Sequence, residues 1–273
     1  MTFLTASDGI AIAVEDHDLR APRSRIVIVH GYAEHRGRYA DLVSRLAPQG
    51  FECHLFDLRG HGHSGGIPAH VARFEQYLDD LQRVVARTRS RMDLPTPLFL
   101  IGHSLGGLIA LEFCRANENS CDGLVVSSPF LRPAFHIPMV KKILAWGASR
   151  IAPTLPFDNT LNPKWLSTDQ KVAEAYASDP LVKRTTTPRW FTEVRSAQQA
   201  LRDHAAEIRL PLLMLLAADD RIADHHAAEV VFAAIGSADK TLEVYPGLRH
   251  EIFNEVERAM VINDVISWIT PRT

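Results

Sequence analysis

The sequence LFLIGHSLGG, residues 98–107, decides the fold class of this chain. Its first residues are apolar, as in a buried strand, and residues 105–116 form a mostly apolar stretch of helical length. Between the two segments lies the pattern G-x-S-x-G, with Ser104 at its centre and Gly102 and Gly106 on either side. Between a strand and a helix this pattern forms a strained turn that lifts the serine above the sheet, and the glycines avoid a clash. We therefore expect Ser104 to be a nucleophile at the end of a strand.

The segments on both sides of this turn alternate between strand-like and helix-like patterns. Short β-branched or apolar runs bounded by turn residues predict strands that are buried on both faces. Apolar residues at helical spacing predict the helices between them. This alternation predicts an α/β fold with a mostly parallel, doubly wound sheet. We predict a hairpin turn at residues 8–9, strands at 25–30, 51–56, 97–101, 123–127, 211–218 and 241–245, and helices at 39–46, 77–85, 105–116, 227–235 and 256–269.

The alternation stops in the middle of the chain. Six of the sixteen prolines lie between Pro129 and Pro163, among aromatic residues and short apolar runs. A doubly wound sheet does not need such a segment, and a length of 273 residues accommodates one large domain with an insertion. We therefore predict a first core segment at 1–129, an inserted, mainly helical cap at 130–205 and a second core segment at 206–273.

Composition excludes several classes of protein. Thirty basic residues are scattered among 32 acidic ones, and the net charge of −2 gives no reason to expect a nucleic-acid partner. The cysteines are Cys53, Cys114 and Cys121, an odd and small number that indicates free thiols in a reducing compartment. The first residues lack the pattern of a secretory signal, and no apolar run has the length of a membrane span. We expect a cytoplasmic enzyme, with peripheral membrane contact left open.

A serine nucleophile requires a base that is held by a third group. With this type of turn the acid follows a later strand and the histidine follows the last strand. Asp219 and Asp220 end the predicted strand 211–218, and His250 follows the predicted strand 241–245. Position favours His250 over the other twelve histidines as the base. The residues alone do not choose between the two aspartates.

An oxyanion hole requires two backbone N–H groups directed at the developing negative charge. One is the N–H of Leu105, the residue after the nucleophile, at the start of a helix whose dipole adds to the effect. The second is expected from the loop after the strand at 25–30, where Tyr32 is the candidate. These groups need no cofactor, and we expect none.

Two histidine pairs and a glycine-rich stretch suggest other sites that we do not expect. His61-Gly62-His63 and His225-His226 have no aspartate, glutamate or cysteine clustered with them at ligand spacing, so we expect no metal. Residues 60–65 lack the lysine and the following helix of a phosphate-binding loop. We expect these glycines to let the backbone pass close beneath the active-site loops.

Four segments carry further motifs: HGYAEH at 30–35, DLRGHGHS at 57–64, GHSLGG at 102–107 and HE at 250–251. With these segments, which span both core parts, the chain resembles the monoacylglycerol lipase and lysophospholipase branch of the α/β-hydrolases, a group also labelled serine aminopeptidase-like. The resemblance implies the α/β-hydrolase fold and a cap that forms an acyl pocket and touches lipid surfaces. It also favours Asp220 as the acid, because Asp220-Arg221-Ile222 matches the family pattern of an aspartate followed by a basic or small residue and an aliphatic one.

The leading hypothesis for function is therefore hydrolysis of a lipid-like carboxylic ester, a monoacylglycerol first of all, through an acyl-Ser104 intermediate. A lysophospholipase, a broad-specificity carboxylesterase or a thioesterase would use the same machinery, since the fold does not determine the scissile bond. A peptidase or a C–C hydrolase is a related alternative. A ligand-binding protein that retained the fold without catalysis is the remote one. The apolar residues and lysines of a cap helix at 139–150 suit either packing over the pocket, which we favour, or contact with a membrane.

Overall fold

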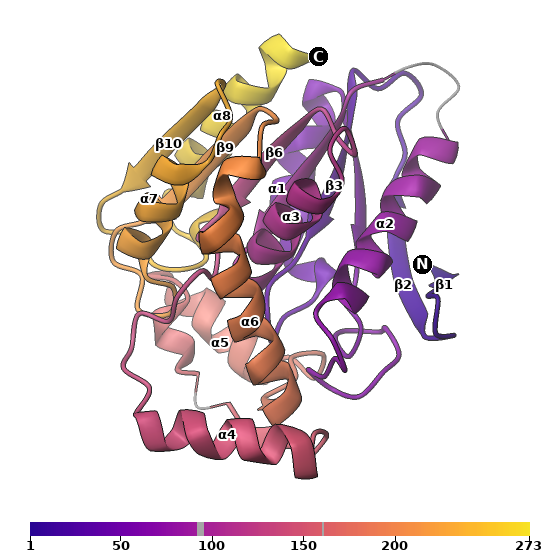
Figure 1. Ribbon diagram of the computed structural model, residues 1–273. Coiled ribbons are helices and arrows are strands. Elements are labelled where there is room, and N and C mark those ends of the chain that lie inside the picture. The colour runs from indigo at the N-terminus through magenta and orange to yellow at the C-terminus, as the bar shows by residue number, and fades with distance from the viewer. Residues whose placement is uncertain (92–95, 160) are drawn as a thin grey trace.

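An eight-stranded sheet forms the centre of the protein (Figure 1), which we describe from a computed structural model covering residues 1–91, 96–159 and 161–273. The strand order is β1-β2-β4-β3-β5-β6-β9-β10. The six strands from β4 to β10 pair in parallel, and β1 and β2 join one edge in antiparallel pairs. The predicted doubly wound α/β architecture is confirmed.

The strands and helices that the sequence predicted lie close to their expected positions, and the structure adds further elements. The strands are Thr2–Thr5 (β1), Ala11–His17 (β2), Ser24–Val29 (β3), Phe51–Phe56 (β4), Leu98–His103 (β5), Gly123–Ser127 (β6), Phe157–Asp158 (β7), Thr185–Thr186 (β8), Leu212–Ala217 (β9) and Lys240–Tyr245 (β10). The helices are Ala40–Leu46 (α1), Glu75–Ser90 (α2), Leu105–Ala116 (α3), Met139–Ile151 (α4), Gln170–Ser178 (α5), Pro188–His204 (α6), His225–Ala234 (α7) and Arg258–Ile269 (α8).

Two hydrophobic clusters cover the two faces of the sheet. One joins the sheet to α1 and α8, and the other joins it to α2, α3, α6 and α7. All residues of β3, β4, β5, β6 and β9 are buried. Burial of each large aliphatic side chain contributes roughly 1.5–3 kcal/mol to stability. These strands are apolar on both faces, so they are stable only between two layers of helices.

The start of α7 differs from the prediction. The predicted helix began at residue 227, where the apolar pattern starts, whereas α7 begins at His225. Asp224 caps the helix, because its Oδ1 accepts a hydrogen bond from the backbone N–H of Ala227 at 3.1 Å. A polar first turn stabilised by a cap has no apolar signature, so periodicity alone placed the start too late.

The segment between β6 and β9 contains α4, α5, α6 and the small antiparallel sheet of β7 and β8. Figure 1 shows α4 at the far end of the molecule from α8, with α6 running from it toward the sheet. One face of α6 belongs to the main core cluster through Trp190, Val194 and Leu201. Cap boundaries at residues 130 and 205 stay a prediction. Among the described residues, no helix has both the length and the apolar character to span a membrane.

Candidate active site

Ser104 sits on a strained turn between β5 and α3. Its φ of 52° lies in the left-handed region, which is unfavourable for a residue with a Cβ atom. A Cβ atom on Gly106 would lie 2.1 Å from the carbonyl oxygen of Val29, and one on Gly102 would lie 2.5 Å from the carbonyl oxygen of Gly106. Side chains cannot occupy either position, so the two glycines let the turn pack against the neighbouring strand.

The structure brings Ser104, His250 and Asp220 into one chain of hydrogen bonds. Ser104 Oγ donates to His250 Nε2 at 2.8 Å, and His250 Nδ1 donates to Asp220 Oδ2 at 2.6 Å. The side chains of His250 and Asp220 are 5% and 1% exposed. Asp219, the alternative left open by the spacing, is exposed and lies outside this chain of bonds. The arrangement is that of a nucleophile, a base and an orienting acid.

The electrostatics of His250 result from two opposing effects. Burial of the ring opposes protonation, but the negative charge of Asp220 and its hydrogen bond outweigh burial. The pKa of His250 is therefore raised above its ordinary value of 6.5. A raised pKa makes the imidazole a stronger proton acceptor toward Ser104, and it requires a correspondingly higher pH for the ring to be neutral.

The two residues expected to form the oxyanion hole lie at the ends of neighbouring strands. Leu105 is the first residue of α3, where N–H groups have no acceptor within the helix. Tyr32 follows β3, which pairs directly with β5. The loop of Tyr32 is held by Glu34, whose Oε1 accepts from the backbone N–H of Gly31 and from the hydroxyl of Tyr39.

Ser104 and His250 line a cavity of about 700 Å³ between the core and the residues after β6. The lining is mostly apolar away from the serine. Segments from α4, α5 and α6 supply much of the wall, as does the loop before α4. The apolar and aromatic lining residues include Phe130, Phe135, Ile137, Leu144, Leu155, Phe157, Leu161, Trp165, Leu166, Tyr176, Trp190, Phe191, Val194 and Ile222.

Comparison with known proteins identifies the relatives of this chain. The model of a hydrolase family described as serine aminopeptidase, S33, matches residues 20–257. The chain belongs to this family. It is 33% identical to the monoacylglycerol lipase of Mycolicibacterium smegmatis, over 91% of this chain and 88% of that protein. It is 33% identical to phospholipase YtpA of Bacillus subtilis, over 87% of this chain and 91% of that protein.

A solved structure places this S33-family member among enzymes with the same architecture. The crystal structure of a monoacylglycerol lipase of Paleococcus ferrophilus superposes with a TM-score of 0.87 at 29% identity, covering 97% of this chain and 99% of that one. These relatives and neighbours confirm the resemblance drawn from the motifs. The protein is a carboxylic ester hydrolase with the α/β-hydrolase fold.

A buried network beside Ser104 and His250 was not predicted. Arg38 lies between two carboxylates: its Nη2 donates to Glu251 at 2.5 Å, and its Nε lies 3.5 Å from Glu34. Burial, and then the neighbouring charge of Glu251, raise the pKa of Glu34 to about 7. The motifs at 30–35 and 250–251 contain Glu34 and Glu251, but nothing in their spacing indicates that the two loops meet.

Hydrogen bonds also connect the loop of Tyr32 to the segment between β6 and β9. The hydroxyl of Tyr32 donates to the carbonyl of Thr185 at 3.1 Å and accepts from Asn159 Nδ2 at 2.9 Å. The Tyr32 ring lies 4.5 Å from the ring of Trp190, between centroids. The cap therefore fixes the side chain of the residue whose backbone is the expected oxyanion donor.

The glycine-rich loop lets the chain approach itself closely, as expected. Gly62 has a φ of 51°, and a Cβ atom there would lie 2.3 Å from the carboxylate of Asp57. That carboxylate accepts from the backbone N–H of Arg36 and of His63. Asp57 thereby joins the glycine-rich loop to the segment after the oxyanion loop.

One expectation about metal ligands was wrong. We expected no acidic residue to be clustered with His225 and His226, but the structure places Glu229 beside both, with ligand atoms within 4.8 Å of one another. Because α7 begins at His225, residues 225, 226 and 229 share one turn of helix. His226 Nδ1 lies 3.0 Å from Glu229 and the group is largely exposed. A hydrogen bond between His226 and Glu229 accounts for their proximity.

Proposed function

We propose that the protein hydrolyses monoacylglycerols, with Ser104 as nucleophile, His250 as general base and acid, and Asp220 as the residue that orients His250. One observation carries the proposal: the hydrogen-bonded chain from Asp220 to Ser104 ends at the wall of a large apolar cavity. Such a cavity suits a single acyl chain whose ester lies at the serine. The monoacylglycerol lipases among the relatives support this substrate class.

The first half of the proposed reaction forms an acyl-enzyme. His250 Nε2 takes the proton of Ser104 as Oγ attacks the carbonyl carbon of the ester. The negative charge that develops on the carbonyl oxygen is accepted by the backbone N–H groups of Tyr32 and Leu105. The tetrahedral intermediate collapses with release of glycerol, whose oxygen takes the proton from His250. The acyl group remains on Ser104.

The second half releases the fatty acid. Water gives a proton to His250 and attacks the acyl carbonyl, and the same two N–H groups stabilise the second tetrahedral intermediate. Ser104 leaves and recovers its proton from His250. Asp220 holds the imidazole in one tautomer through both halves and stabilises its positive charge, without itself becoming protonated.

We propose further that the cap, residues 130–205 between core segments 1–129 and 206–273, brings the enzyme to lipid surfaces through α4. The α4 side chains Met139, Val140 and Ile143 are 64%, 66% and 61% exposed. Lys141 and Arg150 lie on the same helix, a composition that favours binding at the headgroup level of a membrane. Vesicle flotation tests this: the double variant V140D/I143D should lose co-migration that the wild type has. Equal flotation of both proteins would contradict it.

Fatty-acid release from a monoacylglycerol, a lysophospholipid and a short-chain p-nitrophenyl ester, measured side by side, tests the substrate class. We expect the highest kcat/KM with the monoacylglycerol, and no turnover of any substrate by Ser104→Ala. A fluorophosphonate probe should label the wild type and not the variant. Turnover of the short ester alone would contradict the lipid substrate, while retained activity of Ser104→Ala would contradict the nucleophile.

A further inference from the structure

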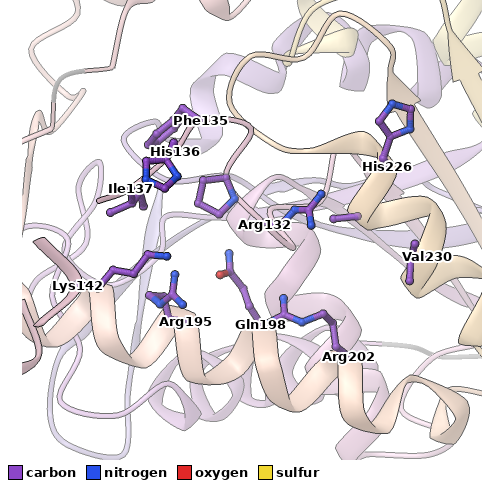
Figure 2. A pocket seen from close by; sticks show the side chains of 12 residues that line it. Arg132, Phe135, His136, Ile137, Lys142, Arg195, Gln198, Arg202, His226 and Val230 are labelled. Carbon is purple, nitrogen blue, oxygen red and sulfur yellow. The ribbon is translucent and has the colours of Figure 1, made fainter. Parts of the chain in front are cut away.

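A second cavity, of about 560 Å³, lies between the loop before α4, α4 itself, α6 and the start of α7. We call it the basic pocket. Figure 2 shows Arg195, Gln198 and Arg202 extending from one face of α6, with Lys142 of α4 directed toward the same space. Among the described residues that line it, none is acidic and six are basic: Arg132, His136, Lys142, Arg195, Arg202 and His226.

Three of the four lysine and arginine side chains have no opposing charge in contact. Arg132 pairs with Asp224, and His226 pairs with Glu229. Within the described part of the chain, no ion pair involves Lys142, Arg195 or Arg202. The guanidinium of Arg202 donates instead to two neutral oxygens, the carbonyl of Leu131 at 3.0 Å and Oε1 of Gln199 at 2.8 Å.

Arg202 lies among like charges in the basic pocket. Burial is the main cause that lowers its pKa; the charge of Asp203 raises the pKa, and repulsion by the charges of Arg195 and Arg132 lowers it. An anion between these side chains would relieve that repulsion and accept charge-assisted hydrogen bonds. Two guanidinium groups and an ammonium favour phosphate, because the planar fork of arginine matches phosphate oxygens.

The basic pocket adjoins the catalytic cavity. Five residues line both cavities: Pro133, Phe135, Ile137, Arg195 and Gln198. The buried Gln198 side chain donates to the carbonyl of Phe130 at 2.8 Å, and the N–H of Phe130 donates to the carbonyl of Ser104 at 2.9 Å. Two hydrogen bonds thus connect the wall of the basic pocket to the nucleophile residue, and the five shared lining residues place the two cavities next to each other.

We propose that the basic pocket binds the phosphate monoester of a single-chain lipid whose acyl ester lies at Ser104, which makes phosphorylated monoacylglycerols a substrate class of this enzyme. The proposal rests on the proposed ester hydrolysis at Ser104. Water cleaves the carboxylic ester as before, and the products are the fatty acid and glycerol phosphate, with the phosphate ester intact. A phosphate monoester carries about −1.5 to −2 charges near neutral pH, which suits the three unpaired cations.

The test compares two substrates that differ only in the phosphate, 1-oleoylglycerol and 1-oleoylglycerol 3-phosphate, in micelles of a neutral detergent. The measured quantity is the ratio of kcat/KM for the phosphorylated lipid to that for the unphosphorylated one. Loss of one charge-assisted contact should lower this ratio about tenfold in Lys142→Gln and in Arg202→Gln. Lys171→Gln, the same charge change at an exposed position of α5, should keep the wild-type ratio. Lys142 makes no side-chain hydrogen bond within the described residues, so we expect Lys142→Gln to fold. This variant therefore still tests the proposal if Arg202→Gln does not fold.

An unchanged ratio in Lys142→Gln and Arg202→Gln would overturn the proposal. The proposal would also be overturned if the two variants differed from the wild type only in binding to vesicles that contain phosphatidic acid. The basic side chains would then contact phosphate of the bilayer and not of the substrate. Inorganic phosphate should inhibit hydrolysis of the phosphorylated lipid more than that of 1-oleoylglycerol, and equal inhibition would count against the pocket. If wild-type enzyme cleaves neither lipid, the proposed function fails. Calorimetric binding of the phosphorylated lipid to Ser104→Ala and to S104A/K142Q then decides the basic pocket by itself.

Discussion

Asp220→Asn is the substitution whose effect follows most directly from the geometry. Oδ1 of Asp220 accepts from the backbone N–H groups of Ile222 at 2.7 Å and Ala223 at 2.9 Å, and Oδ2 accepts from His250 Nδ1 at 2.6 Å. In the asparagine variant the amide oxygen keeps the two backbone donors, so the amide nitrogen must face His250. Nδ1 then has to accept, and the proton moves to Nε2.

This tautomer cannot take a proton from Ser104, because Nε2 already carries one. The same tautomer error in a serine protease triad lowers kcat about 10⁴-fold. We expect a loss of that order in Asp220→Asn, equivalent to about 5.4 kcal/mol of transition-state stabilisation at 1.36 kcal/mol for each factor of ten. The fold should be retained, since the two backbone hydrogen bonds remain.

The assay is kcat/KM for 1-oleoylglycerol, with thermal unfolding as a check on folding. Asp219→Asn is the matched control, because Asp219 is the adjacent, exposed aspartate and makes no side-chain hydrogen bond among the described residues. The control should stay within about twofold of the wild type, as is usual for a surface substitution. A large loss in Asp219→Asn together with a small one in Asp220→Asn would refute the assignment of the acid.

Two further predictions concern pH and the strained turn. His250 must be neutral to act as a base, and its pKa is raised. We therefore expect kcat/KM to fall with decreasing pH, with a midpoint above pH 6.5. A value of kcat/KM that does not change between pH 5 and 8 would contradict this role. Gly106→Ala should lower the urea concentration at the midpoint of unfolding, or prevent folding, because its Cβ would lie 2.1 Å from a backbone oxygen of β3. Overpacking of this kind costs about 1–3 kcal/mol or more. An unchanged midpoint would show that the turn relaxes.

The sheet and the order of the proposed catalytic residues could be predicted because both depend on short-range patterns. Buried parallel strands are apolar without alternation, and a serine between two glycines indicates a turn wherever it joins a strand to a helix. Ser104, His250 and the aspartate pair each follow a predicted strand directly. The carboxyl ends of parallel strands lie at one edge of the sheet, so these residues had to lie near one another.

The residues that the sequence did not reveal depend on contacts between distant loops. Arg38, four residues after Glu34, meets Glu251 only because two loops, each following a strand, fold over one another. The basic pocket is similar, since its cations come from a loop and three helices. Glu229 is a different case: its spacing from His226 would have indicated the pair if the cap residue Asp224 had been recognised as the start of α7.

The cap has a closer connection to the proposed chemistry than its position as an insertion suggests. The backbone N–H of Glu251 donates to the carbonyl of Leu166 at 2.8 Å, next to His250. Glu255 accepts from Ser167 at 2.9 Å, and Tyr32 donates to the carbonyl of Thr185 at 3.1 Å. Each bond contributes about 0.5–1.5 kcal/mol, and together they link the loops of the base and of the oxyanion donor to the same segment. We therefore expect a change that moves residues 166–185 to alter the alignment of His250 and Tyr32, and so to affect the proposed chemistry through the backbone of the segment between β6 and β9.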